Sequence, residues 1–215
     1  MDNFFSKQFF ETWLNQASPE TKDWFQKEAD YLKGRIKPNA TILDVGCGFG
    51  RHIQMLAGFS KAVVGIDNDK IMIDKANENL KNFDNVKLFL QDAGKMEFSD
   101  DTFDYVVCAN NTFGNFREAK SHILNEMKRV CKKEGEIIIS VYSEDALEIR
   151  KNDYEKVGLH ITKIEGGKVT TKEGLISEQF SKDQLIKIFR PLDLTVSINK
   201  LTPISYICVL KNNEP

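Results

Sequence analysis

The stretch "TILDVGCGFGRH", Thr41 to His52, decides the fold of this chain. It begins with the apolar run Thr41–Val45 and then places three glycines within five positions, at Gly46, Gly48 and Gly50. Glycine after a buried strand lets the backbone turn sharply, and it leaves room for a ligand against the N–H groups that begin the next helix. The stretch therefore predicts a strand, a ligand-binding turn and a helix, in that order.

Short apolar runs alternate with helical periodicity along the rest of the chain. Between the runs, apolar residues recur every three or four positions, with Asp69 placed to cap one helix and Gly135 placed to end the next. This alternation is typical of a doubly wound α/β fold, whose parallel sheet is covered on both faces. The expected strands are Thr41–Val45, Ala62–Ile66, Val86–Leu90, Tyr105–Ala109 and Glu136–Tyr142.

The two ends of the chain depart from this alternation. Residues 1–37 predict two helices, with Phe5, Phe9 and Trp13 on one face of the first and Ser18 as the cap of the second. These helices either pack against the sheet or form a lid over a cleft, and both interpretations stay open.

A second departure comes before the last helix. Polar and apolar residues alternate around Gly166-Gly167, which predicts a β-hairpin insertion. A final helix and two strands, Leu194–Lys200 and Ser205–Lys211, follow. We expect one domain, divided into a helical lid (1–37), a ligand-binding core (38–142), an insertion or cap (143–180) and the final helix and strand pair (181–215).

Composition limits the partners. The 30 basic and 32 acidic residues leave a net charge of −2, which gives no general electrostatic attraction to nucleic acid or to an anionic membrane. The four cysteines lack C-x-x-C spacing, so we expect neither a disulfide framework nor a metal site. The amino-terminal residues lack the pattern of a signal peptide, and no stretch is apolar enough to span a membrane, so we expect a cytoplasmic protein.

The glycine spacing separates two kinds of nucleotide cleft. A dinucleotide-binding G-x-G-x-x-G motif that began at Gly46 would need glycine where the chain has Arg51. Asp44, at the tip of the strand, would repel a diphosphate but suits a ligand that carries an ammonium or sulfonium group. Both features disfavour a dinucleotide oxidoreductase.

Further motifs support one family. "LDVGCGFG" resembles the first motif of class I S-adenosylmethionine-dependent methyltransferases, and residues 38–142 match the family's motifs in order. "VVGIDND" resembles the second motif, which implies that Asp67 accepts hydrogen bonds from both ribose hydroxyls of the cofactor. "LQDA" resembles the adenine-binding turn, which implies an acceptor at Asp92 and a backbone donor at Ala93. "FDYVVCANNTFGNF" is similar to the fourth motif and implies that Asn110 lines the methionine moiety.

The resemblance also implies a seven-stranded, mostly parallel sheet whose last strand is antiparallel. Asn68 stands where many relatives carry an apolar residue against the adenine, and "ANNTF" lacks both prolines of the N-P-P-Y type motif. Other candidate cofactor residues are Gly46, Gly48, Cys47 through its backbone, and Arg51, which either meets the cofactor's carboxylate or lies on the surface.

Candidate substrate residues come from the loops around the expected cleft. Asn111 and Thr112 follow the fourth strand and serve either as turn residues or as substrate contacts. Tyr142 ends the fifth strand as a core aromatic or as part of the substrate wall, and His160 reaches the cleft only if the insertion caps it. No catalytic base can be named, because a sulfonium methyl group is already activated and its transfer chiefly needs a positioned nucleophile.

We therefore expect S-adenosylmethionine-dependent methyl transfer to a nitrogen or oxygen atom of a small molecule, with S-adenosylhomocysteine as the product. A protein or peptide acceptor stays open, and so does a non-catalytic role as a sensor of S-adenosylmethionine or as a partner subunit. The sequence does not indicate the oligomeric state.

Overall fold

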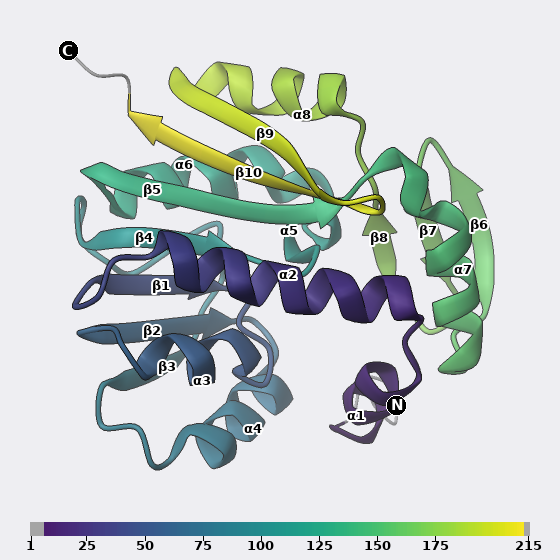
Figure 1. Ribbon diagram of the computed structural model, residues 1–215, viewed down its shortest axis with the longest axis horizontal. Helices are drawn as coiled ribbons and strands as arrows, with labels where there is room; N and C mark the ends of the chain where they lie inside the picture. The colour runs from purple at the N-terminus through teal and green to yellow at the C-terminus, as the bar shows by residue number, and fades with distance from the viewer. Residues whose placement is uncertain (1–6, 213–215) are drawn as a thin grey trace.

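A seven-stranded sheet in the order β3-β2-β1-β4-β5-β10-β9 runs through the computed structural model, which describes residues 7–212 (Figure 1). Strands β1 to β5 are parallel, and β10 is antiparallel to both of its neighbours. This confirms the predicted sheet with an antiparallel last strand. The strands are β1 Thr41–Val45, β2 Ala62–Asp67, β3 Val86–Leu90, β4 Phe103–Cys108, β5 Cys131–Tyr142, β9 Leu194–Thr202 and β10 Ser205–Asn212.

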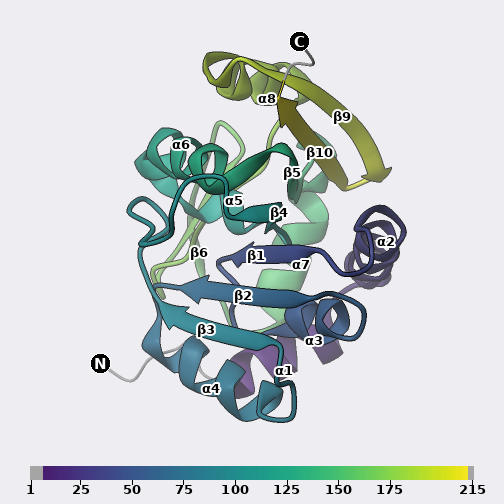
Figure 2. The same ribbon diagram turned by 90° about the vertical axis from the view of Figure 1, so that its left-hand side faces the viewer.

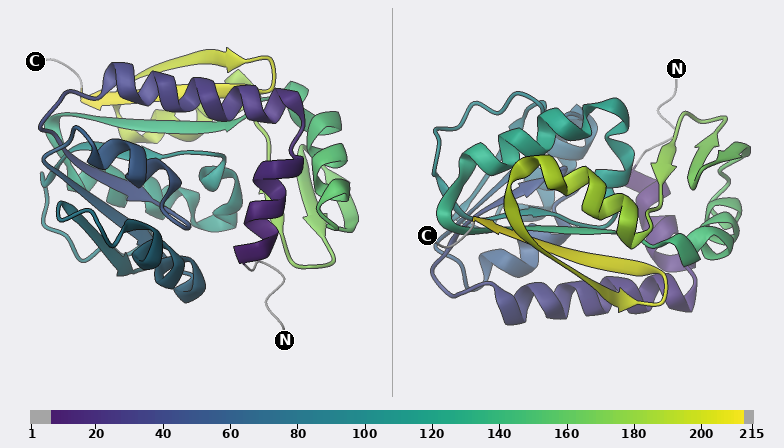
Figure 3. Two further views of the ribbon diagram at one scale, coloured as in Figure 1. Left: turned by 60° about the horizontal axis from the view of Figure 1, so that its bottom comes forward. Right: turned by 90° about the horizontal axis from the view of Figure 1, so that it is seen from above.

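Helices cover both faces of this sheet (Figure 3). On one face, α2, α3 and α4 bury Leu32, Leu56 and Leu80 against the strands. On the other face, α6 and α8 bury Met127 and Phe189. Because both faces are covered, the central strands are apolar along nearly their whole length. The helices are α2 Pro19–Arg35, α3 Arg51–Ala57, α4 Lys70–Leu80, α6 Lys120–Val130 and α8 Lys182–Phe189, followed by the 3-10 turn η3 Arg190–Leu192.

The prediction that Gly135 ends a helix was wrong. Helix α6 ends at Val130, and β5 starts at the next residue. Gly135 lies inside β5, where an added Cβ would be 2.7 Å from the carbonyl oxygen of Asp104. The glycine is therefore needed for the close approach of two neighbouring chain segments rather than for a helix cap.

A second, three-stranded sheet lies beside the carboxyl ends of the parallel strands (Figures 1 and 2). It confirms the predicted hairpin at Gly166-Gly167, whose φ angles of 57° and 83° suit a two-residue turn. The structure adds a third strand and a helix to this insertion. Its elements are the 3-10 turn η2 Glu144–Ala146, α7 Leu147–Lys156, β6 Ile161–Glu165, β7 Lys168–Thr171 and β8 Ile176–Glu178.

The first helix, α1 Lys7–Gln16, lies against this insertion (Figure 3, left). The ring of Trp13 packs on that of Tyr154 with 5.3 Å between centroids. Phe5 and the side chain of Phe9, which were expected on the same face as Trp13, lie outside the described residues. Among residues 7–212, none of the helices has the length and apolar character that crossing a bilayer requires.

Asp153 of α7 joins the insertion to the start of α2. Its carboxylate is buried and accepts hydrogen bonds from the Ser18 amide at 2.8 Å, the Ser18 hydroxyl at 2.9 Å and the Thr21 hydroxyl at 2.7 Å. Ser18 is the predicted cap of α2. The contact between these two elements therefore depends on one buried carboxylate and its three donors.

Replacing this carboxylate is expected to destabilise the fold. Asp153→Ala leaves three donors without their acceptor, which should lower the free energy of unfolding by roughly 3–5 kcal/mol. Glu148→Ala, which removes an exposed carboxylate of the same helix paired with Lys151, should cost less than about 1 kcal/mol. Urea denaturation of both variants measures the difference, and equal midpoints would contradict a structural role for Asp153.

Candidate functional site

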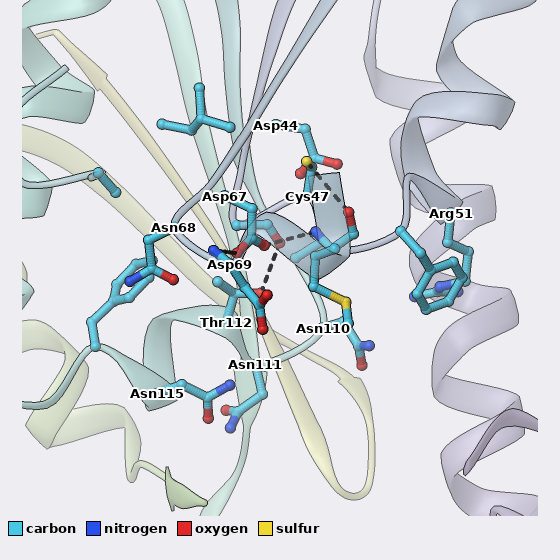
Figure 4. Close-up of a pocket in the computed structure, with 18 of the residues that line it drawn as sticks. Asp44, Cys47, Arg51, Asp67, Asn68, Asp69, Asn110, Asn111, Thr112 and Asn115 are labelled. Atoms are coloured by element: carbon cyan, nitrogen blue, oxygen red, sulfur yellow. Dashed lines mark hydrogen bonds between the residues drawn. The ribbon is translucent and has the colours of Figure 1, made fainter. Parts of the chain in front are cut away.

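A cavity of about 420 Å³ opens at the carboxyl ends of β1, β2 and β4 (Figure 4). The strand order reverses between β1 and β4, and such a reversal leaves a crevice outside the strand ends. All of the predicted cofactor residues line this cavity: Asp44, Gly46, Cys47, Gly48, Arg51, Asp67, Asn68, Asp92, Ala93 and Asn110. Three of the four predicted substrate residues also line it: Asn111, Thr112 and Tyr142.

His160 is the predicted site residue that the structure leaves outside the cavity. Its side chain is 74% exposed, and its Nδ1 atom lies 2.6 Å from Oε1 of Glu173. The histidine precedes β6, and its ring is held by the carboxylate of the neighbouring turn. We therefore withdraw His160 as a substrate residue.

Two glycines of the first turn have different roles. Gly46 has a φ angle of 71°, and an added Cβ would be 2.2 Å from Cγ2 of Thr112, so this glycine allows α5 Thr112–Asn115 to approach β1. Gly48 has a φ angle of 54°, and an added Cβ would meet no atom within 4 Å. The backbone at Gly48 therefore borders open space, as the turn of a ligand-binding cleft requires.

Asp67 ends β2 at the edge of the cavity (Figure 4). Its Oδ2 atom accepts a hydrogen bond from the Gly48 amide at 2.9 Å, and Oδ1 accepts one from the Asp69 amide at 3.0 Å. Burial raises the pKa of this carboxyl above its usual value. Both oxygens are held in place, and each keeps acceptor capacity for the hydroxyl groups of a ligand.

Asp44 is a buried carboxylate whose Oδ2 atom has no hydrogen-bond partner in the described part of the chain. Burial raises its pKa to about 6. An unpaired buried carboxylate is costly, so this position favours a ligand that brings a positively charged donor. The ammonium group of S-adenosylmethionine is such a donor, so the unpartnered oxygen of Asp44 fits this cofactor.

Sequence reasoning missed Glu28, which α2 buries beside the cavity. Its carboxylate accepts a hydrogen bond from the Asn110 amide at 2.9 Å and lies 2.7 Å from Nε2 of His52 and 3.2 Å from an Nη atom of Arg51. Burial raises the pKa of Glu28, but His52 and Arg51 outweigh that effect and lower it to about 2. Arg51, predicted to bind the cofactor or lie on the surface, is therefore tied to a buried carboxylate.

The turn after β4 carries backbone strain. Asn110 and Asn111 are consecutive residues with φ angles of 52° and 59°, a region that residues with side chains adopt at a cost. The side chain of Asn111 accepts a hydrogen bond from the Tyr142 amide at 3.0 Å and donates one to the Ser177 hydroxyl at 3.0 Å. Asn111 therefore ties the sheet to the insertion, which gives it a structural role as well as a place in the cavity.

One end of the cavity is walled by α1, β5 and the insertion. Tyr142 is only 4% exposed and packs on Trp24 with 4.6 Å between ring centroids, while it also lines the cavity. It is thus both a core aromatic and a wall residue. Trp13, noted in the sequence on a helix that either packs on the sheet or forms a lid, belongs to this wall. Sequence reasoning missed its other members, which are Leu14, Tyr154, Leu175 and Ser177.

In the described part of the chain, no three histidine, cysteine, aspartate or glutamate side chains gather in a way that could hold a metal ion. The cavity instead combines acidic side chains at one end with aromatic and hydroxyl side chains at the other. This arrangement suits an organic ligand with ribose and ammonium groups next to a second, less polar molecule.

Residues 36–190 match a family model described as a methyltransferase domain. A demethylmenaquinone methyltransferase of Staphylococcus aureus is 32% identical over 124 residues, which cover 55% of this chain and 50% of that protein. The chain thus spans about half the length of the curated relatives it matches.

Solved structures share the fold. A protein of Pyrococcus horikoshii is 26% identical, with a TM-score of 0.73 over 96% of this chain and 99% of that chain. A 1,6-didemethyltoxoflavin-N1-methyltransferase of Burkholderia thailandensis, solved with 1,6-didemethyltoxoflavin and S-adenosylhomocysteine, is 12% identical, with a TM-score of 0.69 over 91% of this chain and 80% of that chain. Together with the motifs and the family model, the fold shows that the chain belongs to the family of S-adenosylmethionine-dependent methyltransferase domains.

Proposed function

We propose that this chain transfers the methyl group of S-adenosylmethionine to a small molecule. The observation that carries the proposal is the single cavity that joins the acidic edge, at Asp44 and Asp67, to the aromatic wall at Tyr142 and Tyr154. The acidic edge suits the cofactor, and the aromatic wall suits the acceptor. Both molecules would lie in one site closed on one side by α1 and the insertion.

The cofactor would be held by residues of the first four strand ends. We propose that Asp67 accepts from the ribose hydroxyls and that Asp44 accepts from the ammonium group. Asp92 and Ala93 would bind the adenine, and the Gly94 amide, which donates to Oδ1 of Asp92 at 2.8 Å, would hold the Asp92 carboxylate in place. Asn110 would line the methionine moiety.

When bound, S-adenosylmethionine supplies a methyl group that a sulfonium already activates. This chain's own residues then have to orient the acceptor and exclude water. Trp13, Leu14 and Leu175 present apolar surface to the cavity, and the backbone of the strained Asn110-Asn111 turn lies between the two ends. No residue needs to be assigned as a general base for these tasks.

Several observations favour a small acceptor. The relatives named above carry the names of ring compounds, demethylmenaquinone and 1,6-didemethyltoxoflavin. The whole cavity, of about 420 Å³, lies within the size range of small-molecule sites. The net charge of −2 offers no general attraction to nucleic acid. We also propose a cytoplasmic location, which the four free cysteines favour because unpaired thiols suit a reducing compartment.

Calorimetry and a transfer assay test this function. S-adenosylhomocysteine should bind and NADH should not, because Asp44 and Arg51 disfavour a dinucleotide. Labelled S-adenosylmethionine offered with a cell extract should then yield a labelled small molecule. Tight NADH binding without S-adenosylhomocysteine binding would contradict the proposal. Label found only in proteins would point to a protein acceptor, and cofactor binding without any labelled product would point to a sensor.

Asp67→Ala is expected to weaken cofactor binding strongly. A hydrogen bond to a charged acceptor contributes about 1.5–3 kcal/mol, so loss of two, about 3–6 kcal/mol, should lower affinity for S-adenosylhomocysteine by at least roughly a hundredfold. The matched control is Asp74→Ala on α4, whose exposed carboxylate pairs with Lys70 and should not affect affinity. Titration calorimetry measures both variants, and unchanged affinity of Asp67→Ala would remove the proposed ribose contact.

Asp44→Asn is expected to stabilise the ligand-free protein while it weakens cofactor binding. The folded state raises the pKa of Asp44 to about 6. The free energy of unfolding of the ligand-free protein therefore falls as pH rises from about 4 to 6, and this loss of stability is fully present above pH 6. Removing the charge should therefore add about 1–3 kcal/mol at pH 7.

The same carboxylate gives cofactor binding a pH dependence. Because an ammonium group binds the ionised form of Asp44, affinity for S-adenosylhomocysteine should fall by up to about tenfold per pH unit below pH 6. Asn at this position should abolish that dependence. Thermal unfolding and calorimetry at pH 5 and pH 7 test both effects, and a destabilised variant with wild-type affinity would contradict the role of Asp44.

A further inference from the structure

Arg150 of α7 is a fully buried guanidinium without a carboxylate partner in the part of the chain that the structure describes. Its Nη atoms donate to the carbonyl of Gly167 at 3.1 Å, the side chain of Gln179 at 2.8 Å and the carbonyl of Ser177 at 2.7 Å, and its buried Nε atom has no partner. All three acceptors are neutral. The positive charge is therefore hydrogen-bonded but not neutralised, which is unusual for a buried arginine.

This charge lies behind the aromatic wall of the cavity. The guanidinium carbon is 4.9 Å from the ring centroid of Tyr142 and 5.8 Å from that of Tyr154, and both rings line the cavity. Because the protein interior has a low dielectric constant, it screens charge weakly. A positive potential therefore extends from Arg150 through the two rings to the end of the cavity that they wall, which is the proposed acceptor end. That end therefore favours negative charge in whatever binds there.

The Tyr142 hydroxyl is free to contact a ligand. It forms no hydrogen bond with the described residues, whereas the Tyr154 hydroxyl donates to the Ser177 hydroxyl at 3.0 Å. Burial raises the pKa of Tyr142 well above its usual range, so the hydroxyl keeps its proton and can donate a hydrogen bond. An electron-rich atom of a bound molecule is the partner that this donor lacks.

The acidic side chains around this wall have partners elsewhere. Asp153 and Glu28 are the carboxylates that act on Tyr142 with a sign opposite to that of Arg150. Asp153 accepts from Ser18 and Thr21 and lies 3.8 Å from Lys156, and Glu28 pairs with Arg51 and His52. Glu178 pairs with Lys120, and Glu144 accepts from Tyr206. None of these four carboxylates lines the cavity. The carboxylates that do line it lie at or just after the ends of β1, β2 and β3, at the proposed cofactor end, and are Asp44, Asp67, Asp69 and Asp92.

We infer that the acceptor is a ring compound bound as an oxygen anion, a phenolate or an enolate, whose oxygen accepts a hydrogen bond from Tyr142 in the positive potential of Arg150. This inference rests on the proposed methyl transfer and adds the class of acceptor. The aromatic wall of Trp13, Tyr142 and Tyr154 provides apolar surface for the ring. The proton of the acceptor's hydroxyl group passes to solvent before the anion binds.

Two probes of similar size and opposite charge test the inference on the full chain saturated with S-adenosylhomocysteine. We expect para-nitrophenol to bind at least tenfold more tightly than the cationic para-nitrobenzylamine. The bound phenol should also ionise about one pH unit lower than in free solution, which its phenolate absorbance reports, because a tenfold preference for the anion equals one unit. Tighter or equal binding of the amine, an unshifted ionisation, or no binding of either probe would overturn the inference.

Binding of S-adenosylhomocysteine is measured first, so that two failures can be told apart. If this product does not bind, the proposed function fails and the inference fails with it. If it binds but the probes do not behave as stated, the inference alone fails.

Tyr142→Phe keeps the ring and removes the donor. It should lower affinity for the phenol about tenfold and reduce the downward shift in its ionisation. The matched control is Tyr105→Phe on β4, whose hydroxyl lies 3.4 Å from the Lys37 amide, away from the cavity, and which should bind the phenol like the wild type. Wild-type behaviour of Tyr142→Phe would show that this hydroxyl does not position the acceptor.

Arg150→Gln keeps hydrogen-bonding capacity and removes the charge. A folded variant, judged by circular dichroism, should lose the preference for the phenol over the amine, and an unchanged preference would contradict the role of Arg150. If this variant does not fold, the comparison of Tyr142→Phe with the wild type decides the question.

Discussion

The reversal of strand order between β1 and β4 is the constraint on which the cleft depends. The connection after β1 leads into α3 on one face of the sheet, and the chain after β4 leads through α5 into α6, which packs on the other face, so the two strand ends have a gap between them. Gly46 lets α5 approach β1, Gly48 borders the open space of the gap, and Asp67 holds the turn by accepting from the Gly48 amide. Glu28 then fixes the far side of the gap, because it binds the Asn110 amide and both side chains at the start of α3.

The acceptor end depends on segments outside the alternating α/β pattern. Trp13 of α1 and Tyr154 of α7 pack on each other, and Asp153 ties α7 to the start of α2. Both segments line the cavity. That they act as a lid over the cleft stays a prediction, and so does the division of the chain into four functional parts.

The sequence predicted the site best where the geometry of a turn and the chemistry of the ligand require the same types of residue. Glycine spacing, the strand-tip position of Asp44 and the turn after Asp67 predicted the cofactor end, because each follows from local structure. Glu28 was missed because a glutamate side chain normally faces solvent. It nevertheless lies on the buried face of its helix, four residues from both Trp24 and Leu32.

The insertion was predicted less well for a physical reason. Helix α7 buries Arg150, Asp153 and Tyr154, so its inward face is largely polar and has no apolar periodicity to reveal it. The hairpin was visible from Gly166-Gly167, but its orientation was not. His160, expected to reach the cleft if the insertion caps it, instead faces Glu173. Gly135 was misread because close packing between strands and helix termination both favour glycine.

The most direct measurement of the central claim is a crystal structure of this protein with S-adenosylhomocysteine. The account predicts the ligand in the cavity between β1 and β4, with both ribose hydroxyls within about 3.2 Å of the Asp67 carboxylate and the ammonium group beside Asp44. A ligand bound outside this cavity, or bound inside it with the ribose away from Asp67, would contradict the account.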